Sequence, residues 1–284
     1  MTAVSAVAKI AVLRSVVADL RAETTEIVSV LSGLRPSRWD ASTPADGWTI
    51  RDQVTHLAFF DDATMLALAD PASFEMQREQ LLAFGDGFPD EVADRYRALP
   101  AQTCLDWLIR SRDRLLTGYL GTDPSHRIPW YGPDMGLASS ATGRLMETWA
   151  HGQDIVDTVG LVRPATHRLR GIADLGVRTL GFSFQLNRRP PPAAPVRVEL
   201  NGPDNDRWRW GPDDAPNRVT GDALDFCLAV TQRRHLSDTN LSVVGPVATE
   251  WMSIAQAYAG AAGPGRPAGQ FRRRAQRPMN SGVG

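Results

Sequence analysis

The chain has 284 residues, of which 43% are hydrophobic and 22% are charged, and its formal net charge at pH 7 is -1. Such a chain is long enough for two globular domains, and its balanced charge argues against a whole-protein nucleic-acid binder. No apolar run reaches the length of about 18 to 20 residues that a membrane-spanning helix needs. Two isolated cysteines, Cys104 and Cys227, exclude a disulfide framework and argue against thiolate metal ligands.

The first segment predicts a long helix. Apolar side chains recur close to the helical period from residue 3 to residue 33, and Gly33 and Pro36 end the pattern. Lys9 and Asp19 fall at helical spacing, and no A-x-A cleavage site follows. We therefore interpret this segment as the first helix of a cytoplasmic protein and not as a signal peptide.

A second helix is predicted over residues 50–69, and Pro71 stops it. Thr49 and Asp52 form a start signal that resembles a capping box. The middle of this helix, VTHLAFF, is apolar on nearly every side. His56 is therefore expected inside a bundle of helices.

Two more helical segments follow. A short helix is predicted over residues 74–84 and ends at the turn GDGFPD. A longer helix is predicted over roughly residues 89–120, with its apolar side chains on one side. Pro100 is expected to break or kink it, because proline lacks the backbone N–H that an interior helical position donates.

The next helix carries the residues that matter most for function. Either Ser139 or Ser140 is expected to cap its start, and Gly160 closes it. It is the last of four principal helices, which indicates a four-helix bundle over residues 1–165. Arg144 in this helix is interpreted as an ordinary charge near the rim of the bundle.

The second half of the chain has a different pattern. Residues 166–195 predict a bridging helix and a stiff Pro-rich connector, and residues 196–260 predict a small α+β domain. Residues 261–284 form a basic tail rich in Gly, Pro and Arg that we expect to be disordered. The elements expected in the α+β domain are strands at 196–200, 208–210 and 241–244 and helices at 222–234 and 247–258. The predicted fold class is therefore mainly α, a four-helix bundle followed by a small α+β domain.

Glu147 and His151 stand four residues apart, which is one helical turn, so their side chains point the same way. A carboxylate and an imidazole that converge in this way form half of a divalent metal site, and His56 offers the third ligand. Spacing alone leaves two alternatives: a satisfied core histidine at His56, and a surface pair at Glu147 and His151. We favour the metal site, because an unpaired imidazole in an apolar helix is costly and a buried carboxylate needs a cation.

The segments GWTIRDQVTHLAFFDD and METWAHGQDIVDTVG together resemble the metal-binding helical domain of the mycothiol-dependent maleylpyruvate isomerase group, in the DinB-like superfamily. The resemblance covers roughly residues 5–165. It implies a zinc site at His56, Glu147 and His151, with mycothiol as a possible cosubstrate. Three protein ligands leave a position for water or substrate, where a metal can lower the pKa of water toward ~7 or hold a thiol as thiolate.

Several neighbours of the predicted metal site have two interpretations each. Asp154 is either a group that orients a metal ligand or a solvated helix acid. Four aromatic residues, Trp39, Trp48, Trp130 and Tyr131, either line the mouth of a pocket or belong to the core.

The C-terminal half carries a second resemblance. The run VTGDALDFCLAVTQRRH and the segment after it are similar to C-terminal regions described as wyosine-base-formation-like, and also to sterol-carrier-type domains. A radical reaction of the wyosine kind needs clustered cysteines, which this chain lacks. The resemblance to the isomerases implies an arginine that contacts an anionic substrate, and its position falls on Arg233. An arginine fork suits a carboxylate, whereas the alternative is a helix C-terminus whose bases complement its dipole.

The leading functional hypothesis is an isomerase or transferase in which the metal activates a low-molecular-weight thiol such as mycothiol for reaction with a small electrophilic or anionic metabolite. The competing hypothesis is a non-catalytic protein that binds a small molecule or lipid and carries a structural metal. A third hypothesis, association of residues 265–284 with tRNA, predicts steep salt dependence. The sequence leaves the substrate, the native metal and the oligomeric state open.

Overall fold

The structure is a computed structural model that describes residues 3–271. The chain divides into two compact units. Among the described residues, unit 1 comprises residues 3–164 together with Tyr258–Ala261, and unit 2 comprises Ala165–Ala257 together with residues 262–271. Among the residues described, no helix is both long and apolar enough to cross a membrane.

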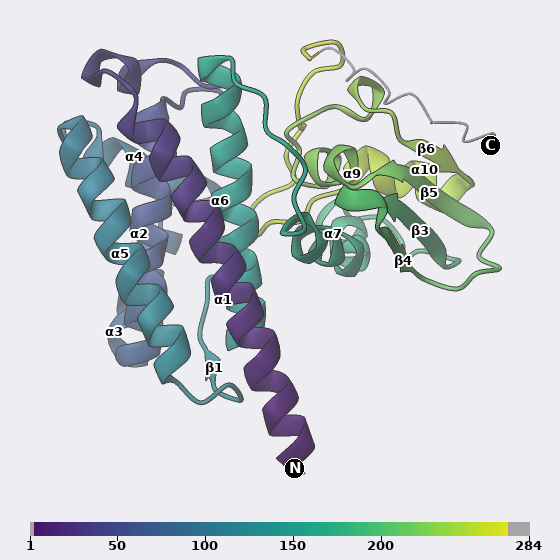
Figure 1. Ribbon diagram of the computed structural model, residues 1–284, viewed down its shortest axis with the longest axis horizontal. Helices are drawn as coiled ribbons and strands as arrows, with labels where there is room; N and C mark the ends of the chain where they lie inside the picture. Colours follow the sequence, from purple (N-terminus) through teal and green to yellow (C-terminus); the bar gives the residue numbers. More distant parts are fainter. Residues whose placement is uncertain (1–2, 272–284) are drawn as a thin grey trace. The chain divides into compact units, whose positions relative to one another are not determined.

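Unit 1 is built on four long helices, α1 (Ala3–Ser32), α2 (Ile50–Ala69), α5 (Ala101–Gly121) and α6 (Leu137–Val159). Both α1 and α2 pack against α5 and α6, so the four helices close into a bundle (Figure 1). The predicted four-helix bundle is therefore confirmed. The shorter elements of the unit are η1 (Pro36–Asp40), α3 (Pro71–Leu82), η2 (Gly85–Gly87), α4 (Phe88–Tyr96), β1 (Arg127–Ile128) and β2 (Met135–Gly136).

The bundle has a closely packed apolar interior to which all four long helices contribute. Leu31 of α1, Val54 of α2, Leu108 of α5 and Ile155 of α6 belong to one cluster of buried side chains. Burying a side chain of this size stabilises the folded state by about 1.5 to 3 kcal/mol relative to leaving it in water. Trp39 is buried in the same cluster, so the core interpretation holds for this aromatic residue.

Two helix ends follow the sequence signals. Thr49 and Asp52 form the expected capping box at the start of α2, in which the Thr49 N–H donates to Asp52 Oδ2 at 2.8 Å. Gly160 ends α6 in the left-handed conformation, at φ 77°. Glycine adopts this φ without the strain that a side chain would cause. The left-handed conformation takes the backbone off the helical path, so the helix closes there.

Two other helix boundaries differ from the prediction. The helix expected over residues 89–120 is two helices, α4 and α5, because the chain leaves the helical path before Pro100. Neither Ser139 nor Ser140 caps α6, which begins at Leu137 directly after strand β2. The Ser140 hydroxyl instead pairs with Tyr119 Oη at 2.7 Å inside the bundle.

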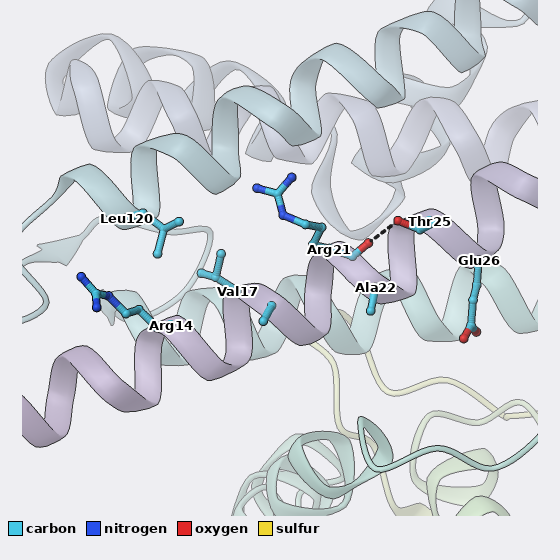
Figure 2. A pocket seen from close by; sticks show the side chains of 8 residues that line it. Arg14, Val17, Arg21, Ala22, Thr25, Glu26 and Leu120 are labelled. Atoms are coloured by element: carbon cyan, nitrogen blue, oxygen red, sulfur yellow. Dashed lines mark hydrogen bonds between the residues drawn. The ribbon is translucent and has the colours of Figure 1, made fainter.

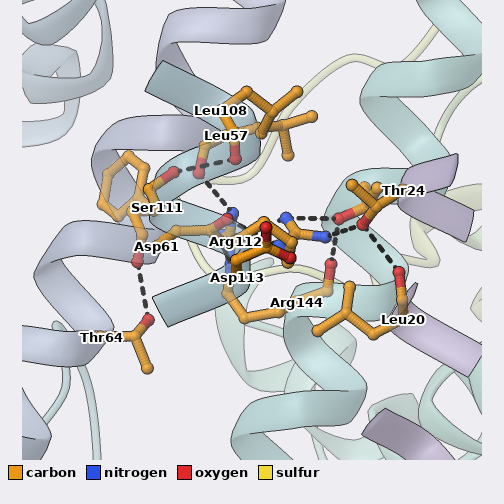
Figure 3. A network of polar contacts seen from close by, with 12 residues as sticks. Leu20, Thr24, Leu57, Asp61, Thr64, Leu108, Ser111, Arg112, Asp113 and Arg144 are labelled. Carbon is orange, nitrogen blue, oxygen red and sulfur yellow. Dashed lines mark hydrogen bonds and ion pairs between the residues drawn. The ribbon is translucent and has the colours of Figure 1, made fainter. Parts of the chain in front are cut away.

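A buried ion network ties the four helices together (Figure 3). Asp61 of α2 accepts hydrogen bonds from Arg112 Nε at 2.6 Å and from Arg144 Nε at 3.0 Å. Arg112 also donates to Thr24 Oγ1 of α1 and to Thr148 Oγ1 of α6. Arg144 is only 3% exposed, so its interpretation as a rim charge is wrong. Its guanidinium is satisfied inside the bundle, which is what a buried charge requires.

Unit 2 contains a four-stranded sheet in the order β4-β3-β5-β6. Strand β3 (Val196–Asn201) pairs antiparallel with β4 (Arg207–Trp210) and parallel with β5 (Asn217–Asp222), and β5 pairs antiparallel with β6 (Ser242–Val244). Helices α9 (Ala223–Val230) and α10 (Pro246–Ile254) pack against this sheet. The remaining elements are α7 (Leu169–Arg178), α8 (Leu180–Leu186), η3 (Pro203–Asn205) and η4 (Leu236–Asp238).

The core of unit 2 lies between the sheet and these helices. Phe226 of α9 and Trp251 of α10 meet with ring centroids 5.9 Å apart, and both are fully buried. Gly176 lets α7 approach α9, since a Cβ at this position would lie 2.8 Å from Val230 Cγ2. Unit 2 is therefore the small α+β structure that the alternating pattern predicts.

One strand and two helix ends of unit 2 differ from the prediction. The helix expected over residues 247–258 is α10, which ends at Ile254. Strand β5 was not predicted, because polar residues occupy most of its positions. The helix expected over residues 222–234 ends at Val230. Gln232 adopts a left-handed φ of 57°, and Arg233 N–H donates back to Leu228 O at 2.8 Å, which is the pattern of a Schellman end. Arg233 therefore follows the helix and does not belong to its last turn.

The basic tail lies largely outside the described residues. Of the arginines in this tail, Arg266 is described, whereas Arg272–Arg274 and Arg277 lie beyond residue 271. The expectation of a disordered tail and the hypothesis of tRNA association both fall mainly on those undescribed positions. They stay predictions.

Candidate metal centre

The candidate site lies between α2 and α6, where the bundle brings His56 against Glu147 and His151. His56 points inward because Gln53 and Phe60, which lie on the same face of α2 one turn away on either side, are both buried. Glu147 and His151 are one turn apart on α6, as their spacing requires. The structure thus brings together the three side chains that the sequence singles out.

The three side chains converge on one point. Glu147 Oε2 lies 3.0 Å from His151 Nε2 and 3.6 Å from His56 Nε2. Ligand atoms of all three residues lie within 4.8 Å of one another. Two donors bound to the same zinc ion at about 2.0 to 2.1 Å in a tetrahedral site stand about 3.3 Å apart. The two separations from Glu147 Oε2 lie on either side of that value, so Glu147 has the spacing of a metal ligand to each histidine.

The protonation states also suit a metal. Burial lowers the pKa of His56 to about 3, with the neighbouring His151 acting in the same direction, so the imidazole is neutral at neutral pH. Burial on its own raises the pKa of Glu147, but hydrogen bonds with His151 and His56 outweigh it and hold the pKa well below the usual range. A neutral imidazole and an ionised carboxylate are the forms in which these groups bind metals.

The hydrogen bonds of His151 provide a second test of fit. Its Nδ1 contacts Gln53 Oε1, and its Nε2 faces Glu147 Oε2. Both partners are acceptors, whereas a neutral imidazole has only one N–H to donate. A cation between Nε2 and the carboxylate resolves this conflict, and that cation is either a proton or a metal ion. The residues present therefore fit a divalent metal.

Aromatic rings enclose the two histidines. Trp48 stacks on His151 with ring centroids 5.8 Å apart, and it lies 5.2 Å from His56. Phe60 contacts His56 with ring centroids 4.6 Å apart and leads into a cluster with Phe74, Phe88, Trp130 and Tyr131. Of the aromatic residues noted in the sequence, Trp48 borders the site directly. Trp130 and Tyr131 reach it through Phe60.

The site keeps one partly open side. The side chain of Glu147 is 22% exposed, compared with 12% for His56 and 10% for His151. A separate hollow of about 770 Å³ lies along α1 and near Leu120 of α5 (Figure 2). Its lining residues include Arg14, Arg21 and Glu26, and none of the three candidate ligands belongs to it. This hollow is thus a feature of the bundle surface and does not form part of the candidate site.

Three other residues bear on the sequence interpretation. Gln53 was missed, although it precedes His56 by one helical turn. Asp154 is fully buried, which rules out a solvated helix acid and leaves the ligand-orienting role as a prediction. Arg233 lies in unit 2, where its Nη1 donates to Thr231 O at 2.7 Å. Its role toward a substrate also stays a prediction.

The fold and the triad define a helical-bundle protein with a candidate three-ligand metal site, followed by an α+β unit. A family model for the mycothiol maleylpyruvate isomerase N-terminal domain matches residues 20–156, and one for wyosine base formation matches residues 192–243. Two crystal structures of the mycothiol-dependent maleylpyruvate isomerase, one of them of a mutant, have a TM-score of 0.54 and 16% identity. Each match covers 78% of this chain and 89% of the other. This likeness shows a shared fold.

Two relatives in Mycobacterium tuberculosis are closer in sequence. They are uncharacterized protein MT0041 of strain CDC 1551 / Oshkosh and uncharacterized protein Rv0036c of strain ATCC 25618 / H37Rv. Each is 47% identical over 251 residues, which cover 88% of this chain and 97% of the relative. The chain belongs to the same family as these two mycobacterial proteins. It carries a mycothiol maleylpyruvate isomerase N-terminal domain and, at its C-terminal side, a wyosine-base-formation domain.

Proposed function

We propose that this chain binds a divalent metal, zinc in the first instance, through His56, Glu147 and His151. We further propose that it is an isomerase or transferase that uses a low-molecular-weight thiol such as mycothiol and acts on a small electrophilic or anionic metabolite. The observation that carries the proposal is the convergence of three metal-binding side chains whose ligand atoms lie within 4.8 Å of one another. The family of the chain supports the thiol and the small-molecule substrate.

The residues of the site have distinct tasks in this proposal. His56, Glu147 and His151 would hold the metal, which would supply the positive charge that favours the thiolate form of a bound thiol. Glu147 is the most exposed of the three ligands, so the thiol approaches from its side. Trp48 and Phe60 exclude water from the imidazole faces, which strengthens electrostatic interactions within the site. A cytoplasmic location suits such partners, because thiols are kept reduced there.

Arg233 is the proposed clamp for an anionic substrate. Its guanidinium is held at the end of α9 by the hydrogen bond to Thr231 O. The planar fork of an arginine can give a carboxylate two parallel hydrogen bonds. This role rests on the position that the family resemblance assigns to an arginine, so it is tested separately from the metal.

The competing function is a non-catalytic protein that binds a small molecule or lipid and has a structural metal. The ion network of Asp61, Arg112 and Arg144 and the apolar core link the four helices without the metal. We therefore expect chelation to leave the helical signal and its thermal midpoint nearly unchanged. Collapse of the bundle on chelation would instead support the structural metal.

The decisive test of the proposed reaction uses the full chain, mycothiol and a panel of electrophilic acids. Thiol-dependent turnover is expected in the zinc-loaded protein, is lost after chelation and returns when zinc is added. His56→Ala should lack the activity under all three conditions. Turnover that survives chelation, or that needs no thiol, would refute the proposal.

A further inference from the structure

The polar contacts around His151 extend beyond the three candidate ligands into α2 and the loop before it. Gln53 stands on α2 one turn before His56, and its side-chain Oε1 contacts His151 Nδ1. Its amide Nε2 donates to Thr43 Oγ1 at 2.9 Å. Thr43 in turn donates its hydroxyl to Trp48 O at 2.9 Å. A chain of hydrogen bonds thus runs from the backbone at Trp48 to the imidazole.

The direction of this chain is determined by its far end. Thr43 Oγ1 lies 2.9 Å from Trp48 O and 3.4 Å from Ala45 O, and both carbonyls can only accept, so the single hydroxyl proton of Thr43 is directed to these two oxygens. Thr43 Oγ1 must then act as an acceptor toward Gln53, which places the amide NH₂ of Gln53 on that side. The amide oxygen is consequently left to face His151, because a flipped amide would put two acceptors together at Thr43.

The orientation of Gln53 has a consequence for His151. An amide oxygen at Nδ1 holds the imidazole in the form that carries a proton on Nδ1 and leaves the lone pair on Nε2. Nε2 is the nitrogen that faces Glu147 Oε2 at 3.0 Å. Gln53 also has a completely buried side chain, so water does not compete for this contact.

We propose that Gln53 is a positioning residue that presents His151 Nε2 to the metal, with Thr43 and the backbone of Trp48 fixing the direction of the Gln53 amide. The inference rests on the proposed metal site and adds a residue to it that binds no metal itself. It explains why a polar side chain is buried on the apolar face of α2. Partners that orient a metal-binding histidine typically contribute 10-fold to 100-fold to metal affinity.

Zinc affinity of the full metal-free chain, measured by competition with a chromophoric chelator, tests the inference. Gln53→Met keeps the size of the side chain and removes the acceptor, and about a 10-fold to 100-fold loss of zinc affinity is expected. Gln53→Glu restores an acceptor and should stay within about threefold of the wild type. Gln102→Met, which removes an exposed amide that bonds Asp106 on α5, is the matched control and should bind zinc like the wild type.

A spectroscopic readout separates positioning from a general loss of structure. In the zinc-loaded wild type, the Nδ1 proton of His151 should be visible by nitrogen-edited NMR because its hydrogen bond to Gln53 protects it from exchange. The same proton should exchange with water and vanish in Gln53→Met and reappear in Gln53→Glu. Zinc affinity and a protected proton that are both unchanged in Gln53→Met would overturn the role of Gln53 alone. A wild type that binds no zinc would overturn the proposed metal site and, with it, this inference.

Discussion

Replacing Asp61 by asparagine should strongly destabilise the bundle. Asparagine has nearly the same size and keeps an acceptor, so the change removes a charge and little else. Asp61 is completely buried and bonds Arg112 Nε at 2.6 Å, Arg112 Nη2 at 3.1 Å and Arg144 Nε at 3.0 Å. Removing one partner of a buried ion pair costs about 3 to 5 kcal/mol, because the opposite charge remains buried without compensation. In Asp61→Asn, two arginines are left in that state.

The assay is denaturant unfolding of the metal-free chain, followed by the helical circular dichroism signal. Asp61→Asn should lose about 3 to 5 kcal/mol, a large part of the ~5 to 15 kcal/mol that stabilises a typical domain. The adjacent residue provides a matched control, since Asp62 pairs with Arg114 at 2.6 Å at the surface. Asp62→Asn should cost less than about 1 kcal/mol. Equal stabilities of the two variants would show that the network contributes little to the stability of the bundle.

Three further predictions concern acid stability, the second unit and substrate recognition. The metal-free chain should lose stability as the pH falls from ~6.5 toward about 3, because unfolded His56 binds a proton that the folded residue does not. A His56→Leu variant should lack this part of the pH dependence of thermal unfolding. Glu147 adds to the loss in more acidic solution, because its depressed folded pKa stabilises the protein above its ordinary value of 4.5 and this contribution is lost as the pH falls through the folded value. Asn217→Ala should destabilise unit 2 by about 1 to 2 kcal/mol, because Asn217 Oδ1 accepts from Val247 N–H at 2.9 Å and so caps α10. An unchanged unfolding midpoint would contradict this prediction. Arg233→Met should raise KM for an anionic substrate at least 10-fold and leave zinc affinity unchanged, and an unchanged KM would remove Arg233 from the substrate site.

The sequence predicted most of the bundle and the candidate site because both depend on local spacing. Helical periodicity places Val54, Leu57 and Ile155 in the core, and the same periodicity turns Glu147 and His151 to one side. His56 was found because an imidazole on an apolar helix needs a partner. Its convergence with the pair on α6 then follows from the packing of two neighbouring helices.

The features that were missed depend on partners far apart in the chain. The sequence of α6 alone suggests that Arg144 is a charge at the rim. Only the packing of α2 and α5 in the bundle brings Asp61 and Arg112 to it. A charged residue on the apolar side of a helix is the signal that could have revealed this network. Gln53 gave a similar signal, one turn before His56. The sequence signal for strand β5 is weak. Its conformation is determined by its place between β3 and β6 and not by its hydrophobicity.

The C-terminal boundary of α9 was mispredicted for a different reason. Helical periodicity continues to Arg234 in the sequence, but Gln232 takes a left-handed conformation that is rare for a residue with a side chain. Glycine commonly marks such an end, and its absence removed the signal. Arg233 is displaced from the helix as a result, which alters the local setting of the proposed substrate clamp.

The central claim is that three residues of the bundle bind a metal ion, and metal content tests it most directly. Wild type purified from metal-replete cells should contain about one equivalent of zinc or another divalent metal per chain, measured by elemental analysis. His56→Ala should contain much less metal while keeping the helical content of the wild type. A wild type that is free of metal, or a His56→Ala variant with the full equivalent, would contradict the assignment of His56, Glu147 and His151 as the ligands.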